Sequence, residues 1–299
     1  MSPWVRRGLV AVVAVAAVGV AVVIVGLQKA QSRMERHLQI PAYELAIPDD
    51  AASIERGRYL YTTRGCVDCH GADGAGRAFV DDGSMRVKGA NISPGPGSVT
   101  LKYTPADWDR TLRHGVKPDG RPLLIMPSED YNRLSDVDLG ALVAYVRQLP
   151  PASGGAAEIV LPLPVRVLYG LGQIPDAASI IDHQRPPEKA VPEGVTLEHG
   201  RYVSAMCIGC HGEHLSGGKV PAGPPSWPPA ANLTPGDGSV MPRYPDAAAL
   251  TKMLREGKRP DGSAIAVMPF ESFKHISDTD VMALHLYLQS LPALAAGNR

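Results

Sequence analysis

The chain has 299 residues, which is long enough for two ordinary domains and the segments that connect them. Lysine plus arginine equals aspartate plus glutamate at 30 each, so the overall charge gives no reason to expect a nucleic-acid partner.

An uncharged apolar run from Gly8 to Leu27 dominates the N-terminus. A helix needs about 20 such residues to cross the hydrocarbon core of a bilayer, and this run has that length. The alternative is a cleaved secretory signal, whose apolar region usually has about 7–15 residues. No clear small-residue cleavage pattern follows the run, so we expect residues 1–40 to form a transmembrane anchor and a stalk.

A first helix is predicted over residues 50–64, with Asp50 or Ser53 as the N-cap. Gly57 lies in the middle of its apolar face. Because a glycine inside a helix costs about 1 kcal/mol relative to alanine, we expect a second helix to cross closely at this position.

Residues 71–100 are rich in glycine, aspartate and proline, and we expect no regular structure there. A helix over residues 104–114 follows, with Thr104 as N-cap and Pro105 at the first helical position.

Ser135 opens a further helix, with Asp138 standing where a capping box usually has glutamate. Its buried stripe is predicted to consist of Leu139, Leu142, Val143 and Val146. We expect this helix to cross the first one near Gly57, with Tyr145 filling the contact.

The second half of the sequence repeats the first. Residues 112–150 match residues 254–292 at a constant offset of 142, without a gap. Such a duplication predicts two copies of one fold, which we place at residues 41–152 and 194–299. The linker between them, residues 153–193, is too apolar for a free tether, so we expect it to pack along one or both domains.

Each half contains one Cys-x-x-Cys-His motif, and these motifs use every cysteine of the chain. Two thiols at this spacing form thioethers with one haem, and the adjacent histidine is delivered to its iron. One alternative is a structural zinc site, which needs four ligands, of which each motif could supply three. The other is a thioredoxin-like redox pair, which should follow a strand of a β-α-β unit, and no such strand precedes either motif. The motif residues are Cys66, Cys69 and His70, and Cys207, Cys210 and His211.

A low-spin haem needs a second axial ligand, and Met126 and Met268 are the candidates. Each is followed directly by proline and occupies the same place in its repeat. Methionine is more commonly a core filler. The equivalent positions of Met126 and Met268 nevertheless favour a ligand role for both, whereas Met85, the other candidate in the first half, is matched by Ser226. Met241 and Met253 have no methionine partner in the first half.

These motifs resemble those of class I c-type cytochromes, and within them the membrane-anchored diheme cytochromes that serve bacterial respiratory dehydrogenases and oxidases. The resemblance covers residues 50–292. Beside the haem motifs and the Met-Pro pairs, it rests on the Asn-Ile/Leu-Ser/Thr-Pro loops at 91–94 and 232–235 and the Pro-Asp-Gly turns at 118–120 and 260–262.

The resemblance implies an all-α fold of two tandem class I cytochrome c domains with two covalently bound haem c groups. It places His70 and Met126 on one iron and His211 and Met268 on the other. It also implies an electron carrier rather than an enzyme, held in the bacterial inner membrane with its haem domains in the periplasm. Its expected partners are a dehydrogenase, a quinol-oxidising complex or an oxidase.

Two other functions are weighed against the carrier. A diheme thiosulfate dehydrogenase with a cysteine ligand is excluded by the cysteine count, and a diheme peroxidase is expected to lack methionine at one site. A subunit that mainly assembles a larger complex differs from the carrier only in its partners.

Arg113 and Arg255 occupy equivalent helix positions, where each is expected either to pair with a haem propionate or to face solvent. For the histidines without a repeat partner we expect surface or packing roles: His114, His199, His214, His275 and His285.

Overall fold

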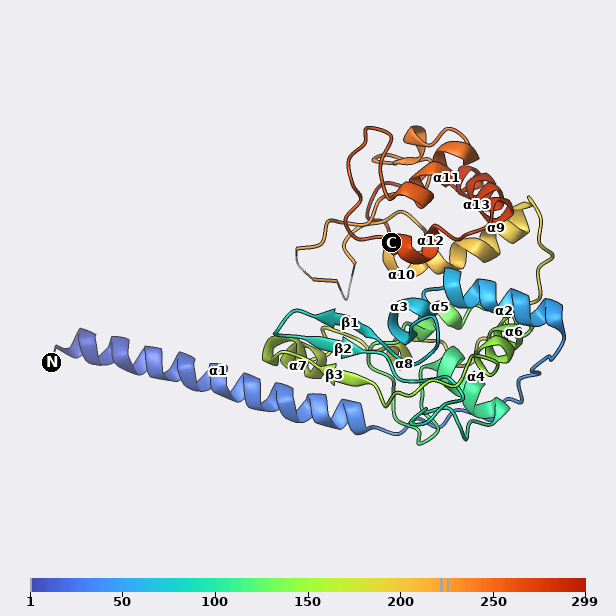
Figure 1. Ribbon diagram of the computed structural model, residues 1–299. Helices are drawn as coiled ribbons and strands as arrows, with labels where there is room; N and C mark the ends of the chain where they lie inside the picture. The colour runs from blue at the N-terminus through green and yellow to red at the C-terminus, as the bar shows by residue number, and fades with distance from the viewer. Residues whose placement is uncertain (1, 221–222, 225) are drawn as a thin grey trace.

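The computed structural model describes residues 2–220, 223–224 and 226–299, and it is mostly helical (Figure 1). The first half contains α1 (Pro3–Glu35), α2 (Ala51–Thr63), α3 (Cys66–His70), β1 (Ala78–Asp81), β2 (Arg86–Lys88), α4 (Pro105–His114), α5 (Ser128–Tyr131) and α6 (Asp136–Val146). The linker contributes β3 (Glu158–Val160), α7 (Leu163–Gly170) and α8 (Ala177–Ile180). The second half contains α9 (Leu197–Ser204), the 3-10 turn η1 (Ala205–Cys207), α10 (Ile208–His211), the 3-10 turn η2 (Met241–Arg243), α11 (Ala247–Glu256), α12 (Phe270–Phe273) and α13 (Asp278–Ser290).

Each half is built around a close crossing of two helices, α2 with α6 in the first half and α9 with α13 in the second. A Cβ on Gly57 of α2 would lie 2.0 Å from the carbonyl oxygen of Ala141 in α6. A Cβ on Gly200 of α9 would lie 2.0 Å from the carbonyl oxygen of Ala283 in α13. The close crossing predicted at Gly57 is therefore confirmed, and the second half repeats it.

The ends of these helices follow their capping residues. Asp50 caps α2 by accepting a hydrogen bond from the backbone N–H of Ser53 at 2.9 Å. Thr104 and Asp107 form the complete capping box of α4. The apolar stripe predicted for α6 is buried, and Tyr145 packs its ring 5.5 Å from that of Tyr61, as expected.

The capping box predicted for α6 forms only in part. The hydroxyl of Ser135 accepts a hydrogen bond from the N–H of Asp138 at 3.2 Å, as expected. The backbone N–H of Ser135, however, donates to the hydroxyl of Tyr202 in the other half at 3.1 Å. An interdomain contact thus replaces the usual bond from the backbone N–H of the N-cap residue to the side chain of the third helical residue.

The expectation that residues 71–100 would have no regular structure was wrong. This segment contains β1 and β2, which form an antiparallel sheet with β3 in the order β1-β2-β3. An isolated hairpin is marginal in water, and here the linker supplies the third strand by pairing Ile159 with Val87. β2 was not predicted because its partner strand, β3, lies about 70 residues later in the chain.

The linker packs along the first half, as expected for a segment too apolar to be a free tether, and it also packs along α1, which was not predicted. A Cβ on Gly115, at the end of α4, would lie 3.3 Å from the Cβ of Ala177 in α8. Arg36, just after α1, makes two hydrogen bonds to the carboxylate of Asp176, at 2.8 and 2.5 Å. These contacts connect the end of α1 to the body of the protein.

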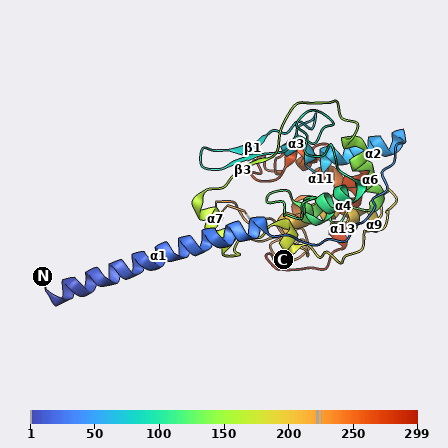
Figure 2. The same cartoon turned by 90° about the horizontal axis from the view of Figure 1, so that it is seen from below.

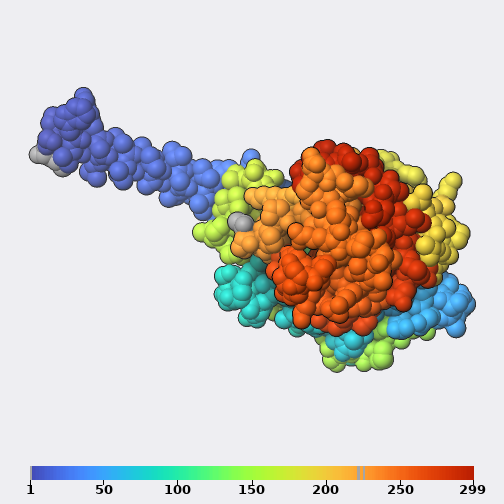
Figure 3. All heavy atoms as spheres, turned by 90° about the horizontal axis from the view of Figure 1, so that it is seen from above, coloured from blue at the N-terminus to red at the C-terminus, as the bar shows by residue number. Residues whose placement is uncertain are grey.

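α1 projects away from the body, as the second and third views show (Figures 2 and 3). Its most apolar stretch has a mean hydropathy of 3.0, and none of that stretch is buried. By length and composition, α1 can cross a membrane.

The two helix crossings can be tested with alanine. Gly57→Ala and Gly200→Ala should each lower the free energy of unfolding by about 1–3 kcal/mol, because the new methyl group meets a backbone carbonyl that cannot move aside. Chemical denaturation followed by circular dichroism measures this change. Gly155→Ala is the control, because its Cβ would have no neighbour within 4 Å. An equal loss in all three variants would contradict the close crossings.

Candidate functional site

The first Cys-x-x-Cys-His motif forms α3, a single helical turn enclosed by glycines. Gly65 before it and Gly71 after it both have positive φ, at 79° and 77°. Tyr61 of α2 donates its hydroxyl hydrogen to the carbonyl of Gly71 at 2.6 Å. A Cβ on Gly89 would lie 2.0 Å from the carbonyl oxygen of Cys69, so the loop after β2 presses directly against the motif.

The histidines of both motifs have the same hydrogen bond. Nδ1 of His70 lies 2.8 Å from the carbonyl oxygen of Ala90, and Nδ1 of His211 lies 2.8 Å from that of Ala231. A carbonyl only accepts, so Nδ1 carries a hydrogen, and in the neutral ring Nε2 then keeps its lone pair. Burial lowers the pKa of both histidines, which favours that neutral form. Each imidazole is thus oriented as metal-binding histidines are.

A buried asparagine fixes each accepting carbonyl. Asn91 is 0% exposed and donates to the carbonyls of Pro96 and Ala152, at 3.1 and 2.9 Å. Its side-chain oxygen accepts from the N–H and the hydroxyl of Ser93. Asn232 makes the equivalent four bonds, to the carbonyls of Asp237 and Leu294 and from Thr234.

The carbonyls of Ala90 and Ala231 were not identified from the sequence. Each lies directly before one of the loops at 91–94 and 232–235, which were noted only for the resemblance that they carry. A backbone atom carries no side-chain signature of its role.

The cysteines fit thioether attachment better than zinc binding. Burial raises the pKa of Cys66 and of Cys207 to about 12, and that of Cys69 to about 11. No disulfide joins these cysteines, and among the described residues no group of three histidine, cysteine or acidic side chains could hold a metal ion. The free thiols and neutral histidines are the groups that a covalently bound haem requires.

The two candidate methionines have equivalent surroundings. Met126 packs against the buried cluster of the first half that includes Cys66, Trp108 and Leu112. Met268 packs against a buried cluster of the second half that includes Leu254. Each methionine carbonyl accepts a hydrogen bond from the residue two positions on, at 2.9 Å in both halves. Their role as axial ligands stays a prediction.

Neither expectation for Arg113 was right. The side chain is 2% exposed, and it donates to Asp109, to the carbonyl of Leu134 and to Asp136, each at 2.8 Å. Arg255 likewise donates to the carbonyl of Ile276 at 2.5 Å. Both guanidinium groups connect a helix to the start of the last helix of their half. Arg113 therefore neither points to solvent nor remains available for a propionate, whereas the side chain of Arg255 is 33% exposed and both expectations for it stay predictions.

The five histidines singled out in the sequence have surface or packing positions, as expected. His214 and His275 are exposed. His285 hydrogen-bonds the carbonyl of Tyr244 at 2.9 Å. His114 lies beside His183, with their Nδ1 atoms 3.0 Å apart, and His199 is buried between the two halves.

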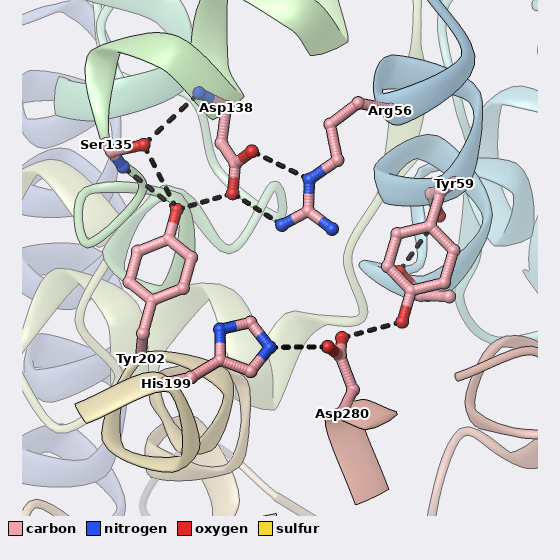
Figure 4. A network of polar contacts seen from close by, with 8 residues as sticks. Arg56, Tyr59, Ser135, Asp138, His199, Tyr202 and Asp280 are labelled. Atoms are coloured by element: carbon pink, nitrogen blue, oxygen red, sulfur yellow. Dashed lines mark hydrogen bonds and ion pairs between the residues drawn. The ribbon is translucent and has the colours of Figure 1, made fainter. Parts of the chain in front are cut away.

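The two halves meet through a reciprocal pair of tyrosine contacts (Figure 4). Tyr59 of α2 donates to the carboxylate of Asp280 in the second half at 2.7 Å. Tyr202 of α9 donates to the carboxylate of Asp138 in the first half, also at 2.7 Å. Because these four residues are equivalent in the repeat, the interface has an approximate two-fold symmetry.

The residue beside each carboxylate differs between the halves. Arg56 makes two hydrogen bonds to Asp138, both at 2.8 Å. Burial alone would raise the pKa of Asp138, but the bonds from Arg56 and Tyr202 lower it overall. At the equivalent place in the second half, Nε2 of His199 lies 2.7 Å from Asp280 (Figure 4).

Each motif also contacts the opposite half. Ser272 of α12 donates to Asp68 within the first motif at 2.8 Å. In the second motif the residue equivalent to Asp68 is Gly209, and the carboxylate of Asp130 from α5 fills the space that a side chain there would occupy. Burial raises the pKa of Asp130 to about 7. The two motifs therefore both lie at the interface, each with one carboxylate beside it.

The asparagines give a test of the loop that orients each histidine. Asn91→Ala should lower the free energy of unfolding by about 2–4 kcal/mol, because four buried hydrogen bonds are lost and some of their partners stay unsatisfied. Chemical denaturation measures this loss, and electron paramagnetic resonance should show a shift in one ferric haem signal only. Asn232→Ala is the matched variant and should shift the other signal. A loss of stability with both signals unchanged would contradict an orienting role.

The sequence of this chain is similar to those of known cytochrome c proteins. A family model described as "Cytochrome C oxidase, cbb3-type, subunit III" matches residues 52–146 and 198–288, one match for each half. The fructose dehydrogenase cytochrome subunit of Gluconobacter japonicus is 29% identical over 273 residues, 81% of this chain and 53% of that protein. The gluconate 2-dehydrogenase cytochrome c subunit of Pantoea cypripedii is 28% identical over 83% of this chain and 62% of its own length.

The chain therefore spans little more than half the length of these dehydrogenase subunits. A relative of similar size is a diheme cytochrome c-type protein of Cereibacter sphaeroides, 26% identical over 80% of this chain and 86% of that protein. Because the family match covers more than half of the sequence and includes both histidine motifs, the chain belongs to the cytochrome c family described as cytochrome c oxidase, cbb3-type, subunit III.

Proposed function

We propose that the protein is a membrane-anchored diheme cytochrome c that carries single electrons in the periplasm, from a respiratory dehydrogenase or a quinol-oxidising complex to an acceptor such as a terminal oxidase. The observation that carries this proposal is the duplicated site. In both halves a Cys-x-x-Cys-His turn presents a neutral histidine whose Nδ1 is bonded to a fixed carbonyl at 2.8 Å.

The residues of each half have distinct tasks. Bound haem supplies one-electron redox chemistry through its iron. Cys66 and Cys69 would hold the first haem, and Cys207 and Cys210 the second. Nε2 of His70 and of His211 would bind the irons, with Met126 and Met268 as the second ligands. If each iron had these two protein ligands, neither would offer a position to a substrate, which favours a carrier over an enzyme.

The relatives favour a dehydrogenase as the electron donor. Fructose dehydrogenase and gluconate 2-dehydrogenase each contain a cytochrome subunit similar to this chain. We therefore infer that this protein takes electrons from a membrane-bound dehydrogenase and acts as an electron-transfer subunit rather than as the catalytic one.

The proposed location follows from α1 and from the motif chemistry. α1 has the length and hydropathy of a membrane span. The flanking charges do not decide its orientation, because Arg6 and Arg7 precede the apolar run while Lys29, Arg33 and Arg36 follow it. Thioether attachment resembles chemistry that bacteria carry out outside the cytoplasmic membrane, so we place both haem domains in the periplasm.

The number of haems can be tested directly. Replacing both Cys66 and Cys69 with alanine should halve the covalently bound haem, because one of the two attachment sites is lost. A denaturing gel stained for haem, together with a pyridine haemochrome assay, measures the change, and the same replacement at Cys207 and Cys210 is the matched control. If either variant kept both haems, the assignment of its motif would be wrong.

The axial methionines can be tested through the reduction potentials. Met126→His should lower the potential of one haem, because imidazole stabilises ferric iron more than a thioether does. Met268→His should lower the potential of the other haem. Redox titration followed in the visible spectrum measures both. Met85→Leu is the control, since Met85 lies in the turn between β1 and β2. Unchanged potentials in either histidine variant would exclude that methionine as a ligand.

A further inference from the structure

α7, in the linker, lies against the end of the proposed membrane span. A Cβ on Gly170 would lie 1.9 Å from the carbonyl oxygen of Gly26 in α1, so the two helices touch through their backbones. A Cβ on Gly26 would lie 2.8 Å from a methyl carbon of Val167. Gly26 is the residue before the last one of the apolar run. α7 is therefore held at the depth where α1 leaves the hydrocarbon core.

The exposed side of α7 is entirely apolar. Between residues 163 and 171 the exposed residues are Leu163, Pro164, Leu168 and Leu171, and the leucines are 52%, 42% and 39% exposed. Pro164, Leu168 and Leu171 are spaced i, i+4, i+7 and share one face of the helix. The one charged residue of α7, Arg166, is only partly exposed. A helix that faces water carries polar residues on its exposed side, so water is not the expected environment of this face.

The neighbouring surface of α1 is also apolar. Val22, Ile24 and Val25 are 45%, 51% and 44% exposed just before the contact with α7. The space-filling view shows the yellow-green atoms of the linker gathered where α1 meets the body (Figure 3). If α1 crosses a bilayer, the apolar face of α7 continues the same lipid-facing surface.

We propose that the leucine face of α7 is embedded in the interfacial layer of the bilayer that α1 crosses, as a second membrane contact of the protein. This inference rests on the anchor in the proposed function. A bilayer fits this face better than a protein partner does, because the adjoining surface of α1 is itself expected to contact acyl chains. Helices with one apolar face bind membranes in this way, lying in the plane of the interface.

The contact would hold the haem domains at a fixed height above the bilayer. Arg33 of α1 donates to the carbonyl of Tyr169 in α7 at 2.6 Å and lies over its ring at 4.6 Å. β3, just before α7, pairs with β2 of the first half. Together these contacts join the span, the interfacial helix and the first haem domain, so the span is not a flexible tether.

The test uses the full-length protein with its haems, reconstituted into phosphatidylcholine liposomes. Leu168→Cys and Leu171→Cys are made singly and spin-labelled. Two controls carry the label at exposed positions: Val18→Cys within α1 and Val137→Cys on α6, which are 64% and 61% exposed. Electron paramagnetic resonance then measures how often each label collides with oxygen, which enters the acyl region, and with a nickel chelate, which stays in water.

We expect labels at 168 and 171 to collide with the nickel chelate several-fold less often than the label at 137, and with oxygen more often. The proposal is overturned if labels at 168 and 171 match the label at 137 while the label at 18 stays shielded. That result would leave the anchor intact and make a protein partner the better occupant of this face. If the label at 18 were also open to the chelate, α1 would not span the bilayer, and both the anchor and this inference would be wrong.

Discussion

The reciprocal contacts of Tyr59 with Asp280 and of Tyr202 with Asp138 determine how the two halves are arranged. Each tyrosine comes from the first helix of one half and reaches the N-terminus of the last helix of the other. Its hydroxyl also accepts a hydrogen bond from the backbone N–H of the N-cap serine there, Ser277 for Tyr59 and Ser135 for Tyr202. One side chain thus forms hydrogen bonds with two polar groups at a buried helix start, the N-cap N–H and a carboxylate. The same arrangement brings both haem motifs to the interface.

The symmetry is approximate, and its departures lie beside the sites. Arg56 is matched by His199, so one carboxylate pairs with a permanent charge and the other with a titratable ring. The carboxylate near the first motif is Asp68 within the motif, whereas the one near the second motif is Asp130 from the opposite half. The surroundings of the two motifs are therefore related but not identical, which would give haems bound there different reduction potentials.

Much of each half could be predicted from the sequence because its signals are local. The caps at Asp50 and Thr104, the stripe of α6 and the glycine at the crossing of α2 and α6 all follow from residues close in the chain. The features that were missed depend on distant partners. β3 pairs with β2 across the linker, and Arg113 is directed by contacts with Asp109, Leu134 and Asp136. The carbonyls of Ala90 and Ala231 could not be recognised because backbone atoms look alike in every sequence. The interface itself could not be predicted, since a repeat does not state how its copies meet.

The most direct test of the central claim is the spectrum of the oxidised wild-type protein. If two equivalent sites each bind iron through histidine and methionine, electron paramagnetic resonance at low temperature should show only low-spin ferric haem, integrating to two haems per chain. The near-infrared spectrum should show the sulfur-to-iron charge-transfer band at the intensity of two haems. A high-spin signal, or a band with half that intensity, would mean that one iron lacks its methionine, and would contradict a pair of closed electron-transfer sites.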